Sequence, residues 1–111
     1  MKVLIVDNAN QSLLTLKQAF YDGPCQTAYV TNGKHALKAL SQFRFDAIIS
    51  VLSLGKISGL ELLKAISLKY PAMIRVAITD GQKHEAQLYT EATNICHYNF
   101  ALPLNIADIH Q

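Results

Sequence analysis

The apolar run Ala47–Leu52 is the feature that most constrains the fold of this chain. Ser50 is its one polar residue, and Asp46 stands immediately before it. Such a short apolar run is typical of a strand that is covered on both faces in a parallel sheet. A loop then runs to Gly59, and the apolar residues of the segment 60–66 keep the spacing of an amphipathic helix. This stretch therefore predicts a buried strand, a loop and a helix.

The rest of the chain repeats this alternation of short strands with helical stretches. The other expected strands are Lys2–Val6, Cys25–Val30, Ile74–Thr79 and Tyr98–Leu102. Three other helices are expected. The first begins near Asn8 or Asn10 and ends before Gly23, the second covers Lys34–Phe43, and the third covers His84–Ala92. Strands that alternate with helices predict right-handed crossovers and a parallel sheet. We expect a flavodoxin-like, doubly wound α/β fold with five strands in the order 2-1-3-4-5 and helices on both faces.

Composition excludes several classes of protein. The chain has 111 residues, of which 50% are hydrophobic and 16% charged, enough for one domain with a single core. The formal net charge is only +2 and the basic residues are spread out, which argues against nucleic-acid binding. No apolar run could span a membrane, and Asp7 interrupts the only candidate signal segment. Cys25 and Cys96 lie far apart, so we expect reduced thiols in a cytoplasmic protein.

The end of the chain predicts less helix than the fold requires. Residues 104–111 provide only about two helical turns, which are marginal alone. We therefore expect either one domain over residues 1–111 taken from a longer polypeptide, or a shortened final helix.

Several short motifs, at consistent spacings over nearly the whole chain, carry a resemblance to a known family. They are Lys2–Asn8 (KVLIVDN), Thr31-Asn32-Gly33, Gly59–Leu63 (GLELL), Thr79 and Pro103. Together they resemble the CheY-like receiver domain of response regulators. The resemblance implies a role in two-component signal transduction or a phosphorelay. The residues around Thr79 look most like the corresponding residues of receivers that are attached to HD or HDOD output domains.

The resemblance also implies a site for phosphoryl transfer, and this chain departs from it. Receivers use a nucleophilic aspartate, two acids that hold Mg²⁺, a lysine and a hydroxyl. Asp7, Asn8 and Thr79 stand at the positions of the two acids and the hydroxyl. Val51 takes the place of the nucleophile and Leu102 that of the lysine.

These two losses are physically consistent with each other. A lysine beside a valine would be a buried cation without a counter-ion, whereas Val51 and Leu102 can close the pocket by apolar contact. The Asp80 carboxylate would repel an incoming phosphate. Without the lysine, the peptide bond before Pro103 would have only a structural role. With Asp7 as the remaining carboxylate, Mg²⁺ binding should be weak or absent, so we expect no cofactor.

We therefore interpret the chain as a pseudo-receiver: a non-enzymatic signalling module that keeps the fold and has lost phosphorylation. It would act on a protein partner, an attached output domain or a second copy in a homodimer. The resemblance places this contact on the face formed by the fourth helix, fifth strand and fifth helix. The residues expected there are Tyr89, His97, Tyr98, Asn99 and Ile106.

Two alternatives and two plainer interpretations stay open. The first alternative is a receiver that senses a metal or small ligand through Asp7, Asn8, Asp80 and Thr79. The second is a small flavodoxin-like enzyme or FMN carrier, which is disfavoured because residues 7–12 contain no glycine to cradle a phosphate. More plainly, Asp7 would cap a helix or accept hydrogen bonds from loop amides, and Thr79 would simply pack at a strand end.

Overall fold

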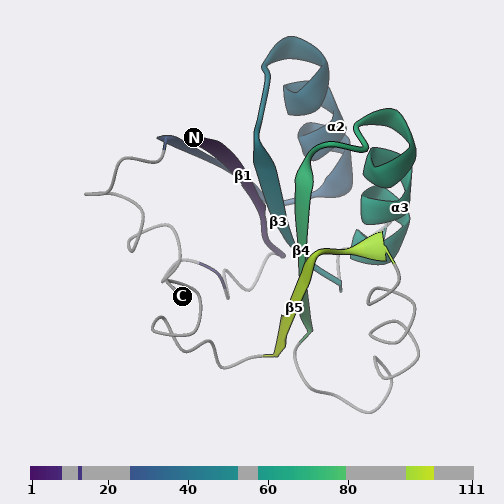
Figure 1. Ribbon diagram of the computed structural model, residues 1–111. Helices are drawn as coiled ribbons and strands as arrows, with labels where there is room; N and C mark the ends of the chain where they lie inside the picture. The colour runs from purple at the N-terminus through teal and green to yellow at the C-terminus, as the bar shows by residue number, and fades with distance from the viewer. Residues whose placement is uncertain (9–12, 14–25, 53–57, 80–94, 102–111) are drawn as a thin grey trace.

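The sheet has the predicted strand order. The computed structural model describes residues 1–8, 13, 26–52, 58–79 and 95–101. These residues contain a five-stranded parallel sheet in the order β2-β1-β3-β4-β5 (Figure 1). The strands are β1 (Lys2–Val6), β2 (Gln26–Val30), β3 (Ala47–Val51), β4 (Ile74–Thr79) and β5 (Tyr98–Ala101). The flavodoxin-like fold class is thus confirmed.

The central strands form the core, as their composition predicted. Every residue of β3 is buried, and so is all of β1 after Lys2. Strands buried on both faces carry continuous apolar runs because neither face contacts water.

One strand boundary differs from the prediction. β3 was expected to include Leu52, but it ends at Val51. The Leu52 amide still donates to the Ile78 carbonyl at 2.9 Å, whereas the Leu52 carbonyl accepts from the Gly59 amide at 2.9 Å. The chain leaves the sheet here because that carbonyl bonds to the start of the next helix. The predicted ends of two other strands, Cys25 and Leu102, lie outside the described residues.

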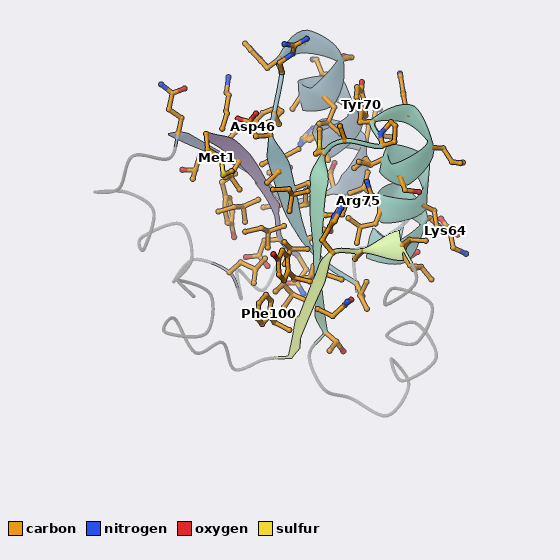
Figure 2. All side chains as sticks on the ribbon, viewed as in Figure 1. Met1, Asp46, Lys64, Tyr70, Arg75 and Phe100 are labelled. Carbon is orange, nitrogen blue, oxygen red and sulfur yellow. The ribbon has the colours of Figure 1, made fainter. Side chains whose placement is uncertain are left out.

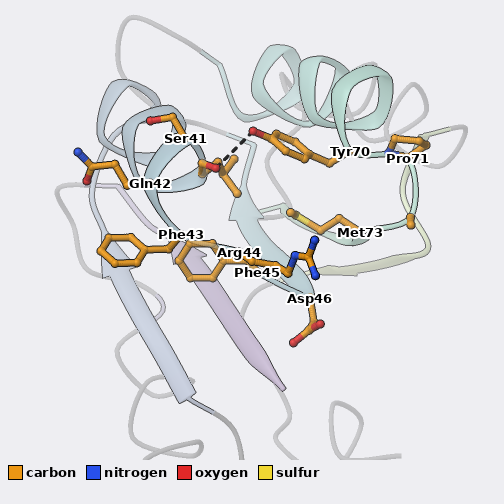
Figure 3. Close-up of a pocket in the computed structure, with 11 residues that line it drawn as sticks. Ser41, Gln42, Phe43, Arg44, Phe45, Asp46, Tyr70, Pro71 and Met73 are labelled. Atoms are coloured by element: carbon orange, nitrogen blue, oxygen red, sulfur yellow. Dashed lines mark hydrogen bonds between the residues drawn. The ribbon is translucent and has the colours of Figure 1, made fainter.

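Two helices, α2 (Gly33–Gln42) and α3 (Gly59–Lys69), lie side by side on one face of the sheet (Figures 1 and 3). Each begins at a capping side chain. Asn32 Oδ1 accepts from the His35 amide at 2.7 Å, and Ser58 Oγ accepts from the Glu61 amide at 3.1 Å. Both bonds satisfy amides that the first helical turn leaves without a partner.

The helices expected near residues 9–22, over His84–Ala92 and over 104–111 lie outside the described residues. In the part of the chain that the structure describes, no helix has the length and apolar character needed to cross a membrane.

Candidate functional site

The carboxyl ends of three neighbouring strands gather the predicted site residues. Asp7 and Asn8 follow β1, Val51 ends β3 and Thr79 ends β4. Because β1, β3 and β4 are adjacent and parallel, these ends meet at one edge of the sheet. Open α/β sheets place their binding sites at this edge. The other predicted residues, Asp80, Leu102 and Pro103, lie outside the described residues, so the pairing of Val51 with Leu102 stays a prediction.

Val51 is an apolar, buried residue at the end of β3. Its side chain is 3% exposed, and its Cα pairs with that of Ile78 in the sheet. The neighbouring Ser50 is also buried, and its hydroxyl donates to the Val51 carbonyl at 2.9 Å. Neither of these two residues presents a carboxylate, the group that accepts the phosphoryl group in receivers.

Asp7 is fully buried, and both oxygens of its carboxylate accept hydrogen bonds. Oδ1 accepts from the Asn8 amide at 2.7 Å. Oδ2 accepts from the Leu13 amide at 2.8 Å and from the Tyr29 hydroxyl. A buried carboxylate needs such donors because it has lost its hydration. The interpretation of Asp7 as an acceptor for loop amides is confirmed.

Tyr29 is the site residue that sequence reasoning missed. It lies on β2, where its Cα pairs with that of Ile5, and the Asp7 amide donates to the carbonyl of the next residue, Val30, at 2.9 Å. Burial, followed by the hydrogen bond to Asp7 and the charge of Asp7, raises the pKa of the Tyr29 hydroxyl above its ordinary range. The hydroxyl therefore keeps its proton at neutral pH and donates a hydrogen bond to Asp7. The available signal was the strand order, which places the end of β2 beside the end of β1.

The described residues do not fit a Mg²⁺ ion at this edge. Mg²⁺ requires octahedral oxygen ligands, and carboxylates usually anchor it. Val51 supplies no side-chain oxygen, Asn8 supplies a neutral amide, and the Asp7 oxygens already accept hydrogen bonds. Among the described residues, no three His, Cys, Asp or Glu side chains gather as metal ligands would.

The predicted interaction face is described only around β5. Tyr98 is 58% exposed and the preceding His97 is also exposed. Asn99 is half-buried, and its Oδ1 accepts no hydrogen bond from the described residues. Tyr89 and Ile106 lie outside the described residues. His97 is not only a surface residue, because its Nδ1 accepts from the Arg75 amide at 3.0 Å.

Arg75 connects β4 to the segment that precedes β5 (Figure 2). Its Nε donates to the Ile95 carbonyl at 2.6 Å. Its Nη1 donates to the carbonyls of Met73, at 3.0 Å, and Pro71, at 3.2 Å. One guanidinium thus holds two segments that are far apart in sequence, the turn before β4 and the residue Ile95 before β5, and a rigid fork of donors suits this arrangement.

A pocket of 610 Å³ lies at the opposite edge of the sheet, between the end of α2 and the turn after α3 (Figure 3). Its lining includes the large side chains of Phe43, Phe45, Tyr70 and Met73. The Lys2 ammonium lies 4.6 Å from the ring centre of Phe43 and 5.2 Å from that of Phe45. Figure 2 shows Tyr70 and Asp46, both lining residues, at the far end of the molecule from Phe100 on β5. The pocket is therefore separate from the carboxyl ends of the strands, where Asp7 lies.

Comparison with solved structures finds the same fold in several receivers. The receiver domain of an HD domain-containing protein from Pseudomonas fluorescens is 23% identical, with a TM-score of 0.90 over 98% of this chain and 87% of that chain. A CheY-like receiver domain from Methylobacillus flagellatus is 28% identical, with a TM-score of 0.80 over 98% and 92%. A response regulator from Thermotoga maritima, solved in complex with Mg²⁺ and BeF, is 20% identical, with a TM-score of 0.83 over 98% and 92%.

Comparison with curated proteins finds no match. In contrast, the sequence profile of the response regulator receiver domain matches residues 3–98, which is most of the chain. The strand order, the gathering of Asp7, Val51 and Thr79 at one edge, and this match agree with one another. The chain belongs to the response regulator receiver domain family.

Proposed function

We propose that this receiver domain signals without being phosphorylated, through contact with a protein partner or an attached output domain. The observation that carries the proposal is the buried Val51 at the end of β3. A valine has no oxygen that could attack a phosphoryl donor, and no neighbouring carboxylate among the described residues replaces it. The resemblance places Leu102 where receivers have a lysine, which removes the cation as well. We propose no catalytic role for the domain.

The state of Asp7 further supports this proposal. Phosphoryl transfer in receivers requires a divalent cation beside the acceptor. Here the Asp7 carboxylate accepts hydrogen bonds from within the protein, and Asn8 replaces the second acid. The same contacts disfavour the alternative in which Asp7, Asn8, Asp80 and Thr79 sense a metal.

Intact-mass measurement after incubation with acetyl phosphate and Mg²⁺ tests the loss of phosphorylation. We expect the mass of the wild-type chain to stay unchanged. Val51→Asp alone should also form no stable adduct, because Leu102 leaves the new carboxylate and its phosphoryl group without a cation. Val51→Asp/Leu102→Lys is the matched comparison, and any adduct should require both substitutions. A stable acyl-phosphate on the wild type or on Val51→Asp would contradict the proposal.

The surface around β5 is the proposed contact region. Tyr98 exposes more than half of its side chain on an edge strand, and exposed aromatic residues are enriched at protein interfaces. Leu68, which is 85% exposed on α3, is a matched apolar control elsewhere on the molecule. If the domain forms homodimers through β5, Tyr98→Glu should shift the sedimentation equilibrium toward monomer and Leu68→Glu should not. Equal effects of the two substitutions would contradict this placement.

An HD-type output domain is the attached partner that we propose. The receiver from Pseudomonas fluorescens that shares this fold comes from an HD domain-containing protein. The sequence context of Thr79 and Gly81 independently resembles receivers of that class. Sequencing the gene on both sides of the codons for residues 1–111 tests this proposal, since an HD or HDOD domain should precede or follow the receiver in the full-length polypeptide.

A further inference from the structure

The Asp7 carboxylate has an internal donor that the resemblance to active receivers does not explain. Tyr29 reaches it from the neighbouring strand β2 and donates its hydroxyl to Oδ2. The Leu13 amide donates to the same oxygen at 2.8 Å. A carboxylate oxygen that already accepts two hydrogen bonds has little capacity left for a metal ion. The phenol and the amide therefore compete directly with any cation that approaches this oxygen.

The burial of Asp7 makes this competition effective. The carboxylate is fully buried, so the electrostatic strength of each hydrogen bond is greater than it would be in water. A cation that displaced the phenol would also break the hydrogen bond from the Tyr29 hydroxyl to the buried carboxylate, and a hydrogen bond to a charged group is among the stronger ones. The Asn8 amide holds Oδ1 at 2.7 Å, so rotation of the carboxylate does not free an oxygen cheaply.

We propose that Tyr29 is a positioning residue that keeps divalent cations from Asp7 by occupying Oδ2 with its hydroxyl. This inference rests on the proposed loss of phosphorylation and adds a second barrier to it, distinct from Val51. In this arrangement a hydroxyl fixed on β2 donates a hydrogen bond to Asp7 in place of an exchangeable cation. This hydrogen bond also joins β2 to the residue that follows β1.

The test measures Mg²⁺ affinity in backgrounds that supply a new carboxylate. Asn8→Asp and Val51→Asp are two such hosts, and each is compared with and without Tyr29→Phe. Amide chemical shifts near residue 7 report binding. We expect Tyr29→Phe to increase the Mg²⁺ affinity of a folded host by about tenfold, the factor that corresponds to one hydrogen bond to a charged group. A purely structural role for Tyr29 would leave the affinity unchanged or weaken it.

Two controls keep the outcome interpretable. Tyr70→Phe removes a hydroxyl that donates to the Leu40 carbonyl at the opposite edge, and it should not change the affinity. If Val51→Asp fails to fold, the Asn8→Asp host answers the question alone, because Asn8 is only partly buried. Equal Mg²⁺ affinities with and without the Tyr29 hydroxyl would overturn the inference. That result would not contradict the proposed function. The proposed function is contradicted by a different result, the formation of an acyl-phosphate on the wild-type chain.

Discussion

Gly59 lies directly against the backbone of Val51. A Cβ atom on residue 59 would lie 1.9 Å from the Val51 carbonyl oxygen and 2.8 Å from the Leu52 Cα. Both neighbours are backbone atoms, so no flexible side chain could move aside. The Gly59 amide also donates to the Leu52 carbonyl at 2.9 Å. The start of α3 is thus packed against the end of β3, beside the buried Val51.

Gly59→Ala should therefore destabilise the protein. Insertion of one methyl group into a packed backbone contact forces the helix and strand apart, and we expect a loss of about 3 kcal/mol in the free energy of unfolding. Urea denaturation measures this loss. Ser67→Ala, in the same helix, is the control and should change stability by less than about 0.5 kcal/mol. Similar midpoints for the two variants would show that the contact is looser than the structure indicates.

The Ser58 cap gives a second prediction. Its Oγ accepts from the Glu61 amide at 3.1 Å, so Ser58→Ala should cost about 1 kcal/mol of stability. Ser58→Asp should retain full stability, because a carboxylate also accepts this bond and interacts favourably with the helix N-terminus. Thermal unfolding of both variants checks the pair. A Ser58→Ala variant as stable as the wild type would mean that the hydroxyl does not act as a cap.

The sequence predicted the fold well because apolar patterning dominates it. The runs in β1 and β3 have no polar face, which is characteristic of strands at the centre of a parallel sheet. Right-handed crossovers then limit the possible strand orders, and the order 2-1-3-4-5 is the one that the flavodoxin-like fold class implies. Asp7, Val51 and Thr79 could be assigned to one edge because each stands at the end of a predicted parallel strand.

The role of Tyr29 could not be predicted in the same way. It depends on the register between β2 and β1, and a shift of one residue would move this side chain to the other face of the sheet. In the structure Tyr29 pairs with Ile5, which places its hydroxyl within reach of Asp7. β2 is only partly buried, so its pattern constrains the register weakly.

The bonding of His97 escaped prediction for a related reason. Sequence reasoning assigned it to an exposed interaction face, and it is exposed. Its Nδ1 nevertheless accepts from the Arg75 amide, and its own amide donates to the Arg75 carbonyl at 2.8 Å. Contacts between residues so far apart in sequence appear only once β4 and β5 are paired.

Arg75 provides a third prediction. Its guanidinium donates to the carbonyls of Pro71 and Met73, which precede β4, and to that of Ile95 at 2.6 Å. Arg75→Met should lower the free energy of unfolding by about 2 kcal/mol, since it leaves these carbonyls without a charged donor. Arg75→Lys should recover little of this loss, because an ammonium cannot reproduce the planar fork. Urea denaturation compares the three proteins. Full recovery by lysine would show that charge alone matters at this position.

Hydrogen exchange locates the effect of the same substitution. The His97 amide, which bonds to the Arg75 carbonyl, should exchange faster in Arg75→Met than in the wild type. The Leu52 amide, which bonds to Ile78 near the other end of β4, should change only as much as global stability does. Uniform acceleration at both amides would argue against a local role for the guanidinium.

The Cys96 thiol provides the last prediction, on pH. Burial raises its pKa from 9.0 to about 11, and the positive charge of Arg75 acts in the opposite direction. Because the folded-state pKa lies above the unfolded value, folding favours the neutral thiol. Its contribution to stability is fully present below pH 9 and is lost as the pH rises through 11. Cys96→Ala should therefore make stability less dependent on pH in this window, as measured by urea denaturation at several pH values.

The same pKa shift predicts that Cys96 is unreactive in the folded protein. Thiolate is the reactive form, so at pH 8 a shift of this size should slow alkylation about a hundredfold relative to the urea-unfolded chain. Peptide mass spectrometry after maleimide treatment resolves Cys96 from Cys25. Arg75→Met should slow the reaction further if the fold is kept, since it removes the charge that favours the thiolate. Rapid labelling of Cys96 in the folded chain would contradict its burial and show that the segment before β5 opens readily.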